Sequence, residues 1–363
     1  MHMKKLYELK LEEKIGQLFM VGINGKEIDN NIRTLITKYK VGGVILYRKN
    51  YSNYDEMLKL INQLKEINSS NSIPLFIAVD QEGGRVNRMP KEFKNLNSAK
   101  KLTLNDDLDV VKDSGKILGK MLFETGINMN FAPVMDIQKF PDNHPIGDRC
   151  YGDNAEKVCK YSLEVMKAIQ KQNVISVIKH FPGHGATKKD SHFFLPVIGK
   201  TIEEMESSDL IPFENAIKNA ADSIMIGHLL FKKIDRIFPV SLSSKFITKY
   251  LRKKYRYNGV LISDDIKMKS VNFFYGPKYA SIKALKAGND IVMMRISYRN
   301  QIEIINKLKK MIENKSYPEY KINKKVNRIL KLKEKYNIND SLALGCNIEE
   351  INNEIDCINN KYS

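Results

Sequence analysis

The chain contains no uncharged apolar run near 20 residues, so no segment is predicted to span a lipid bilayer. It also lacks the continuous apolar stretch of a secretory signal. The basic residues 1–5 are followed by a segment, residues 6–15, that is interrupted by Glu8, Lys10, Glu12, Glu13 and Lys14. We therefore expect a cytoplasmic protein with no membrane partner.

Cysteine is scarce. The four cysteines are Cys150, Cys159, Cys346 and Cys357, and they form no CxxC pair and no spacing typical of metal ligands. They are predicted to be free thiols in a reducing compartment.

Acidic residues are outnumbered, with 42 Asp and Glu against 60 Lys and Arg, which gives a net charge of +18. Such a charge would suit an anionic partner such as nucleic acid, phospholipid headgroups or an acidic polymer. However, lysine occurs on nearly every polar face, and no RNA-stacking or groove-reading motif accompanies it. We expect no nucleic-acid partner, while a non-catalytic barrel that binds an anionic polymer stays open as an alternative.

Eight short β-branched or apolar runs alternate with charged amphipathic segments long enough for helices. Helical periodicity is clear in residues 56–64 and 156–169. Alternating strands and helices imply parallel pairing, and eight such units predict a single (β/α)8 barrel. The runs are residues 17–23, 41–47, 75–79, 129–135, 174–179, 223–227, 260–263 and 290–294.

No Pro/Ser linker or low-complexity segment divides the chain. We assign residues 1–336 to the barrel domain and residues 337–363 to a C-terminal tail. Apolar residues at helical spacing predict a short packed helix over residues 348–358.

Polar residues follow five of the runs. Because the carboxyl ends of barrel strands share one face, these residues are expected to meet at one mouth. Charged residues often follow strands, so each case alone is weak evidence, whereas five together indicate an active site. They are Asp80 to Arg85, Asp136, Lys179 with His180, His228, and Asp264 with Asp265.

Asp264 directly follows the buried-looking run 260–263, which would fix its position. It is the best candidate for a nucleophile or an electrostatic stabiliser. Asp265 points elsewhere if the chain is still extended, and we expect it to cap the following helix, since Asp is a preferred N-cap residue.

Three of the six histidines lie in residues 179–192, a polar loop with Gly and Pro that follows the fifth run. Asp190 and His192 are two residues apart and could form a carboxylate–imidazole pair, which equips a histidine to transfer protons near neutral pH. An Asp-x-His pattern alone is usually structural, but its place in this loop favours catalysis. For His184 we expect a role in shaping the loop.

A zinc site is the main competing interpretation of this loop, with His180, His184, His192 and His228 as possible ligands. Barrel metallohydrolases generally supply an His-x-His pair from the first strand, and residues 17–23 contain none. Lys179 would also place a positive charge beside the ion. We predict no metal.

Several motifs together resemble glycoside hydrolase family 3, and more narrowly its β-N-acetylglucosaminidases of bacterial cell-wall recycling. The resemblance extends over about residues 10 to 336, in the order expected for the family. The motifs are AVDQEGGRVNRM (residues 78–89), NMNFAPVMDI (128–137), IGDRCYG (146–152), KHFPGHGATKKDSHFFLP (179–196) and GVLISDDIKM (259–268).

By this resemblance Asp264 matches the family's nucleophile, which forms a covalent glycosyl-enzyme, and His192, paired with Asp190, matches its acid/base. The resemblance also implies retention of configuration, no metal or organic cofactor, and a small N-acetylglucosaminide substrate such as a muropeptide fragment. We expect a monomer. The positions that match sugar-binding residues of the family are Asp80, Arg88, Arg149, Lys179 and His180.

One position departs from the pattern: Ala186 stands where relatives often carry Asp. The change leaves the acceptor open. A histidine, unlike a carboxylate, does not repel an incoming anion, so phosphorolysis is the enzymatic alternative to hydrolysis.

Overall fold

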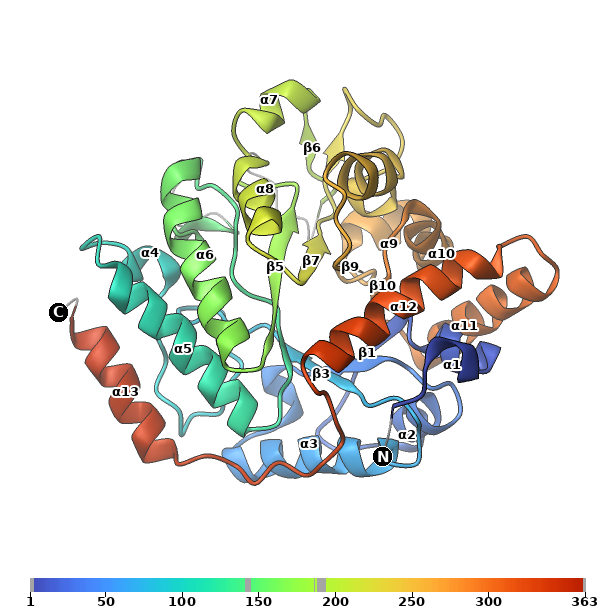
Figure 1. The fold of residues 1–363 in the computed structure, drawn as a ribbon, viewed down its shortest axis with the longest axis horizontal. Coiled ribbons are helices and arrows are strands. Elements are labelled where there is room, and N and C mark those ends of the chain that lie inside the picture. Colours follow the sequence, from blue (N-terminus) through green and yellow to red (C-terminus); the bar gives the residue numbers. More distant parts are fainter. Residues whose placement is uncertain (1–2, 141–144, 186, 188–193, 362–363) are drawn as a thin grey trace.

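The computed structural model describes residues 3–140, 145–185, 187 and 194–361. Eight parallel strands close into a barrel in the order β1-β10-β9-β7-β5-β4-β3-β2, with helices around it (Figure 1). Each of the eight predicted runs overlaps one barrel strand, and β5 extends two residues beyond its run, so the (β/α)8 prediction is confirmed. The strands are β1 (Phe19–Gly22), β2 (Gly43–Ile45), β3 (Phe76–Val79), β4 (Met129–Asn130), β5 (Ile175–Phe181), β7 (Ser223–Ile226), β9 (Val260–Ser263) and β10 (Ile291–Met294).

The outer layer contains α-helices and a π-helix, η5 (Lys245–Lys254), which lies in the chain between β7 and β9. Short 3-10 helices are η1 (Leu6–Glu8), η2 (Arg48–Asn50), η3 (Gly147–Arg149) and η4 (Val240–Leu242). Two long helices begin with asparagine caps, because Asn53 and Asn154 each accept a hydrogen bond from the backbone N–H three residues on. The α-helices are α1 (Leu11–Gly16), α2 (Asn30–Thr37), α3 (Tyr54–Asn68), α4 (Ala99–Leu102), α5 (Leu108–Glu124), α6 (Ala155–Lys171), α7 (Ile202–Glu206), α8 (Ile211–Lys218), α9 (Lys269–Tyr275), α10 (Pro277–Ala287), α11 (Tyr298–Glu313), α12 (Glu319–Lys335) and α13 (Ile348–Asn360).

Two further strands, β6 (Val197–Ile198) and β8 (Leu230–Phe231), pair in parallel outside the barrel. They were not predicted, because each is two residues long and shows no alternation that a sequence pattern could reveal.

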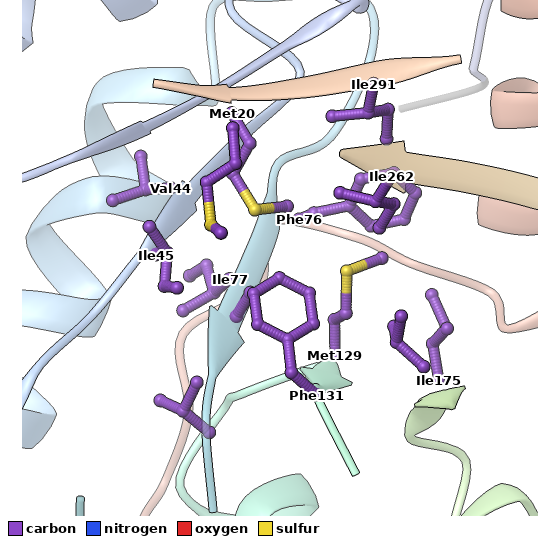
Figure 2. Close-up of a cluster of buried hydrophobic side chains, with 14 of the residues drawn as sticks. Met20, Val44, Ile45, Phe76, Ile77, Met129, Phe131, Ile175, Ile262 and Ile291 are labelled. Carbon is purple, nitrogen blue, oxygen red and sulfur yellow. The ribbon is translucent and has the colours of Figure 1, made fainter. Parts of the chain in front are cut away.

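The barrel strands are buried on both faces, as their β-branched and apolar composition requires. Apolar side chains from β1, β2, β3, β4, β5, β9 and β10 belong to one buried cluster (Figure 2). A packed interior leaves only the strand ends and their loops available for chemistry. The labelled members are Met20, Val44, Ile45, Phe76, Ile77, Met129, Phe131, Ile175, Ile262 and Ile291.

The amino-terminal end of the barrel is closed by a buried lysine, Lys333 of α12. Its Nζ donates to Oε1 of Gln17 at 2.7 Å, to the carbonyl of Gly42 at 3.0 Å and to that of Pro74 at 2.6 Å. These acceptors precede β1, β2 and β3, so one ammonium group joins three strands to α12. It also lies 4.4 Å from the ring centroid of Phe76.

Replacing Lys333 by Met is expected to lower the free energy of unfolding by about 2 to 3 kcal/mol, because buried acceptors lose their donor. Urea denaturation measures the change. Lys331→Met, at an exposed position of the same helix, is the matched control and should change stability by less than about 0.5 kcal/mol. Equal effects of the two changes would contradict the role of the ammonium group.

The C-terminal segment turns back along α3 and ends in α13, which lies beside α5 (Figure 1). Asn62 of α3 pairs with the backbone of Ala343 in both directions, at 2.8 and 3.0 Å. The predicted helix over residues 348–358 is confirmed. Throughout the described part of the chain, every helix is too short or too polar to cross a membrane.

Candidate active site

The carboxyl ends of the strands bring distant polar residues together, as the barrel prediction requires. Lys179, on β5, donates to Oδ1 of Asp80, which follows β3, at 2.7 Å. Asp136 lies after β4, where Val134 forms a parallel bridge to Lys179. Lys179 and Asp80 are 99 positions apart in the sequence.

A network of four charged side chains, of which Glu82 and Lys179 are buried, lies under one side of this mouth. Glu82 accepts from Arg149 through both carboxylate oxygens, at 2.7 and 2.8 Å, and Nζ of Lys179 lies 2.6 Å from its Oε1. Burial alone would raise the pKa of Glu82, but Arg149 and Lys179 outweigh it and hold the pKa well below its usual range. With Asp80 included, two carboxylates balance two cations.

The loop that carries Asp80, Glu82 and Arg88, residues 80–89, is fixed by its own amide side chain and by β4. Asn130 donates to the backbone carbonyl of Gln81 at 2.9 Å and accepts from its N–H at 3.0 Å. The Gln81 side chain in turn accepts from the backbone N–H of Arg88 at 2.6 Å. Asp80 and Glu82 therefore project from a backbone that is held on both sides.

A second buried carboxylate, Asp136, orients the histidine segment. Its Oδ2 lies 2.8 Å from Nδ1 of His180, and its Oδ1 accepts from the backbone N–H of His184 at 2.7 Å. Burial tends to raise the pKa of Asp136, but the two histidines lower it overall. Burial also lowers the pKa of His184 to about 4, so this side chain is neutral near pH 7.

Asp264 lies directly after β9 and is partly exposed. Its backbone N–H donates to the carbonyl of Ile226 at the end of β7, at 3.0 Å, and its Oδ1 accepts from the N–H of Asp265 at 2.7 Å. The strand therefore presents this carboxylate at the mouth.

The prediction that Asp265 caps the next helix is wrong. Residue Met268 is the N-cap of α9 and makes no side-chain cap bond. Asp265 instead binds the guanidinium group of Arg295 and accepts from the N–H of Lys267 at 3.0 Å. An ion pair with the neighbouring strand end is available only in the closed barrel, so it was not visible in the local sequence.

Tyr47 and Arg295 are mouth residues that the sequence analysis missed. The guanidinium carbon of Arg295 lies 4.1 Å from the Tyr47 ring centroid, and that of Arg88 lies 5.7 Å from it. The pKa of Tyr47 is raised well above its usual value, first by burial and then by the charge of Asp80, with smaller effects of Asp265 and Asp264. Tyr47 thus lies within electrostatic range of both Asp80 and Asp264, which belong to opposite sides of the barrel.

Arg295 directly follows β10, so the rule that found the other strand-end residues would have found it as well. Arg88 sits on the 80–89 loop, where its carbonyl accepts from the Tyr51 hydroxyl at 2.8 Å. Its Nε is buried and makes no hydrogen bond with any described residue. A buried donor of this kind suits a polar ligand.

Both ring nitrogens of His228 have hydrogen-bond partners within the protein. Its Nδ1 lies 2.7 Å from Oγ of the Ser241 side chain, and its Nε2 lies 3.1 Å from the backbone carbonyl oxygen of Asp265. Across the described ranges, no three His, Cys, Asp or Glu side chains cluster as metal ligands do. Asp190, His192 and Ala186 lie outside the described residues.

The resulting mouth combines a strand-end carboxylate with donors and acceptors suited to a polyhydroxylated ligand. Asp264 offers a negative charge on one side, while Asp80, Lys179, His180 and Arg88 offer hydrogen-bonding groups on the other. An anionic group facing such a set can act as a nucleophile or stabilise a developing positive charge.

The chain is similar to a known protein family and to several known proteins. The family described as "Glycosyl hydrolase family 3 N terminal domain" matches residues 10–332. β-Hexosaminidase A of Pseudoalteromonas piscicida is 33% identical over 326 residues, which cover 83% of this chain but 54% of that protein. The chain therefore spans about half the length of that relative.

A shorter relative and a solved structure are also similar. A β-hexosaminidase of Nitrosospira multiformis is 31% identical over 281 residues, covering 76% of this chain and 79% of that protein. A family 3 β-N-acetylglucosaminidase from Paenibacillus sp. str. FPU-7 superimposes with a TM-score of 0.91 at 34% identity, covering 96% of this chain and 68% of that one.

Proposed function

Because this chain belongs to family 3 of the glycosyl hydrolases, we propose that it is an exo-acting β-N-acetylglucosaminidase that removes non-reducing terminal N-acetylglucosamine. The observation that carries the proposal is the position of Asp264, at the end of β9, facing the mouth that also contains Asp80 and Lys179. The names of the relatives, β-hexosaminidase and β-N-acetylglucosaminidase, support the same substrate class.

The proposed reaction has two steps. In the first, Asp264 attacks the anomeric carbon, the bond to the leaving oxygen breaks, and His192 donates a proton to that oxygen. In the second, neutral His192 accepts a proton from water, the water oxygen attacks the anomeric carbon, and the bond to Asp264 breaks. Two inversions give retention of configuration, and no metal or organic cofactor takes part.

The remaining candidates hold the sugar. Asp80 and His180 can bond to hydroxyl groups, and Lys179 between Asp80 and Glu82 supplies a fixed positive charge. Arg88 is a further candidate for binding the sugar, whereas Arg149 is bound to Glu82 and holds that side of the site in place. In this proposal the barrel comprises residues 1–336, the substrates are cell-wall muropeptide fragments, and the protein acts as a cytoplasmic monomer.

A turnover assay with 4-nitrophenyl N-acetyl-β-glucosaminide tests the proposal, with the matching β-glucoside as the control. We expect turnover of the N-acetylglucosaminide alone. Adding phosphate should not change the rate or produce a sugar 1-phosphate, whereas formation of that product would establish phosphorolysis. Absence of turnover together with salt-sensitive binding to an anionic polymer would favour the non-catalytic barrel.

His192→Ala is predicted to reduce turnover of a disaccharide substrate, whose leaving group is a sugar, by about 100- to 10,000-fold. The reason is that a sugar alkoxide must be protonated as it departs. The loss on the aryl substrate should be smaller, since a nitrophenolate needs little protonation. Steady-state rates on both substrates measure the difference. Equal losses on the two substrates would argue against the acid role of His192.

A further inference from the structure

The contacts of the C-terminal helix point to a role in substrate binding, and we propose that α13 positions the 80–89 loop. In this proposal Asn352 and Asn359 are positioning residues: they hold residues 92–97, and these in turn hold the glycines beside Glu82. The inference rests on the proposed function, because the 80–89 loop carries the candidate sugar-binding residues Asp80 and Arg88.

The helix is firmly seated on the barrel. Ile351, Ile355 and Ile358 are buried against the main apolar core. On another side of the helix, Lys120 of α5 forms ion pairs with Glu350 and Glu354. Because these contacts fix its position, α13 can serve as a rigid support.

From this support, two asparagines reach the irregular residues 92–97. Asn352 accepts from the backbone N–H of Lys94 at 2.7 Å and donates to the carbonyl of Glu92 at 2.8 Å. Asn359 accepts from the N–H of Asn97 at 2.9 Å and donates to the carbonyl of Asn95 at 3.0 Å. Each amide therefore pairs with one donor and one acceptor of a backbone that has no helix or strand partner of its own.

Residues 92–97 are bound directly to the glycines of the 80–89 loop. The side chain of Asn95 donates to the carbonyl of Gly84 at 2.6 Å, and the N–H of Gly84 donates to the carbonyl of Leu96 at 2.7 Å. Gly83 and Gly84 have positive φ angles of 89° and 53°. A Cβ at Gly83 would lie 2.9 Å from the carbonyl oxygen of Asn97, so the close approach of the two segments requires glycine.

Glu82 connects the glycines of the 80–89 loop to the candidate sugar-binding residues. Gly83 follows Glu82, whose carboxylate binds both Arg149 and Lys179. A shift of residues 92–97 would therefore move Glu82 and, with it, the ammonium group that lies between Glu82 and Asp80. Ligand affinity should be sensitive to such a shift, whereas Asp264 lies on another strand and should be unaffected.

The test compares Asn352→Leu and Asn359→Leu with wild type, since leucine has nearly the shape of asparagine and cannot form the hydrogen bonds. We expect KM for the aryl N-acetylglucosaminide to rise by roughly 2- to 30-fold with kcat little changed. Asn359→Asp, which keeps the acceptor for the N–H of Asn97, should restore part of the affinity. Asn353→Leu is the matched control, because it makes the same substitution at an exposed position of the same helix.

Hydrogen exchange of residues 83–89, measured without substrate, separates this inference from the proposed function. Faster exchange in Asn352→Leu and Asn359→Leu than in Asn353→Leu supports the positioning role even if the wild type proves inactive on N-acetylglucosaminides. An unchanged KM in Asn352→Leu and Asn359→Leu of an active enzyme, exchange at residues 83–89 equal to that of wild type, or an equal rise of KM in Asn353→Leu would each overturn it.

Discussion

Asp264→Asn is expected to lower kcat for the aryl N-acetylglucosaminide by about 1,000-fold or more, the scale of loss seen when a catalytic carboxylate is removed. An amide oxygen is a poor nucleophile toward the anomeric carbon and carries no charge to stabilise an oxocarbenium-like transition state. A good leaving group should not rescue the variant. Nitrophenolate departs with little help from a general acid, but the anomeric carbon still needs a nucleophile.

The change at residue 264 should leave the fold intact. Asparagine has the same shape, and its Oδ1 can still accept from the N–H of Asp265. Asp265→Asn is the matched control: it weakens the pair with Arg295, so it should lower thermal stability while retaining far more of kcat. If Asp264→Asn were as active as wild type, the nucleophile assignment would be wrong.

The barrel could be predicted because each strand is a short buried run with a charged segment after it. This pattern survives in the sequence since both faces of a barrel strand are covered. The approach of Lys179 to Asp80 also followed from topology, because parallel strands place their carboxyl ends on one face. Neither inference needed side-chain detail.

Side-chain pairing at the mouth could not be predicted in the same way. Glu82 and Arg149 are 67 residues apart, and only the closed barrel shows that they form a bidentate pair. Asp265 has a residue type typical of helix caps, yet the ion pair with Arg295 competes for its carboxylate. Local propensity was overruled there by a contact between two strand ends.

For the C-terminal tail, the helix could be predicted from the sequence but its contacts could not. Apolar spacing predicted the helix α13, since Ile351, Ile355 and Ile358 form one buried face. The contacts of Asn352 and Asn359 with residues 92–97 depend on where the helix lies. A single asparagine on a helix forms no periodic pattern from which such a contact could be predicted. The sequence predicts that the helix forms, but only the structure shows which residues it contacts.

Glu82→Gln is expected to lower the free energy of unfolding at pH 7 by about 3 to 5 kcal/mol, because it leaves buried Arg149 and Lys179 with one carboxylate between them. Urea denaturation measures the loss. Glu12→Gln is the matched control. Because the pair of Glu12 with Lys309 is largely exposed, this change should lower the free energy of unfolding by less than about 1 kcal/mol.

The effect of Glu82 should also depend on pH, with a sign fixed by its lowered pKa. The folded protein holds this carboxylate ionised to lower pH than the unfolded chain, whose pKa is near 4.5. Its contribution is therefore complete above about pH 5 and decreases by about 1.4 kcal/mol for each pH unit below the unfolded pKa. The stability difference between wild type and Glu82→Gln should accordingly narrow between pH 5 and pH 3. A difference that is constant or widens over this range would show that the ion network does not stabilise the ionised form of Glu82.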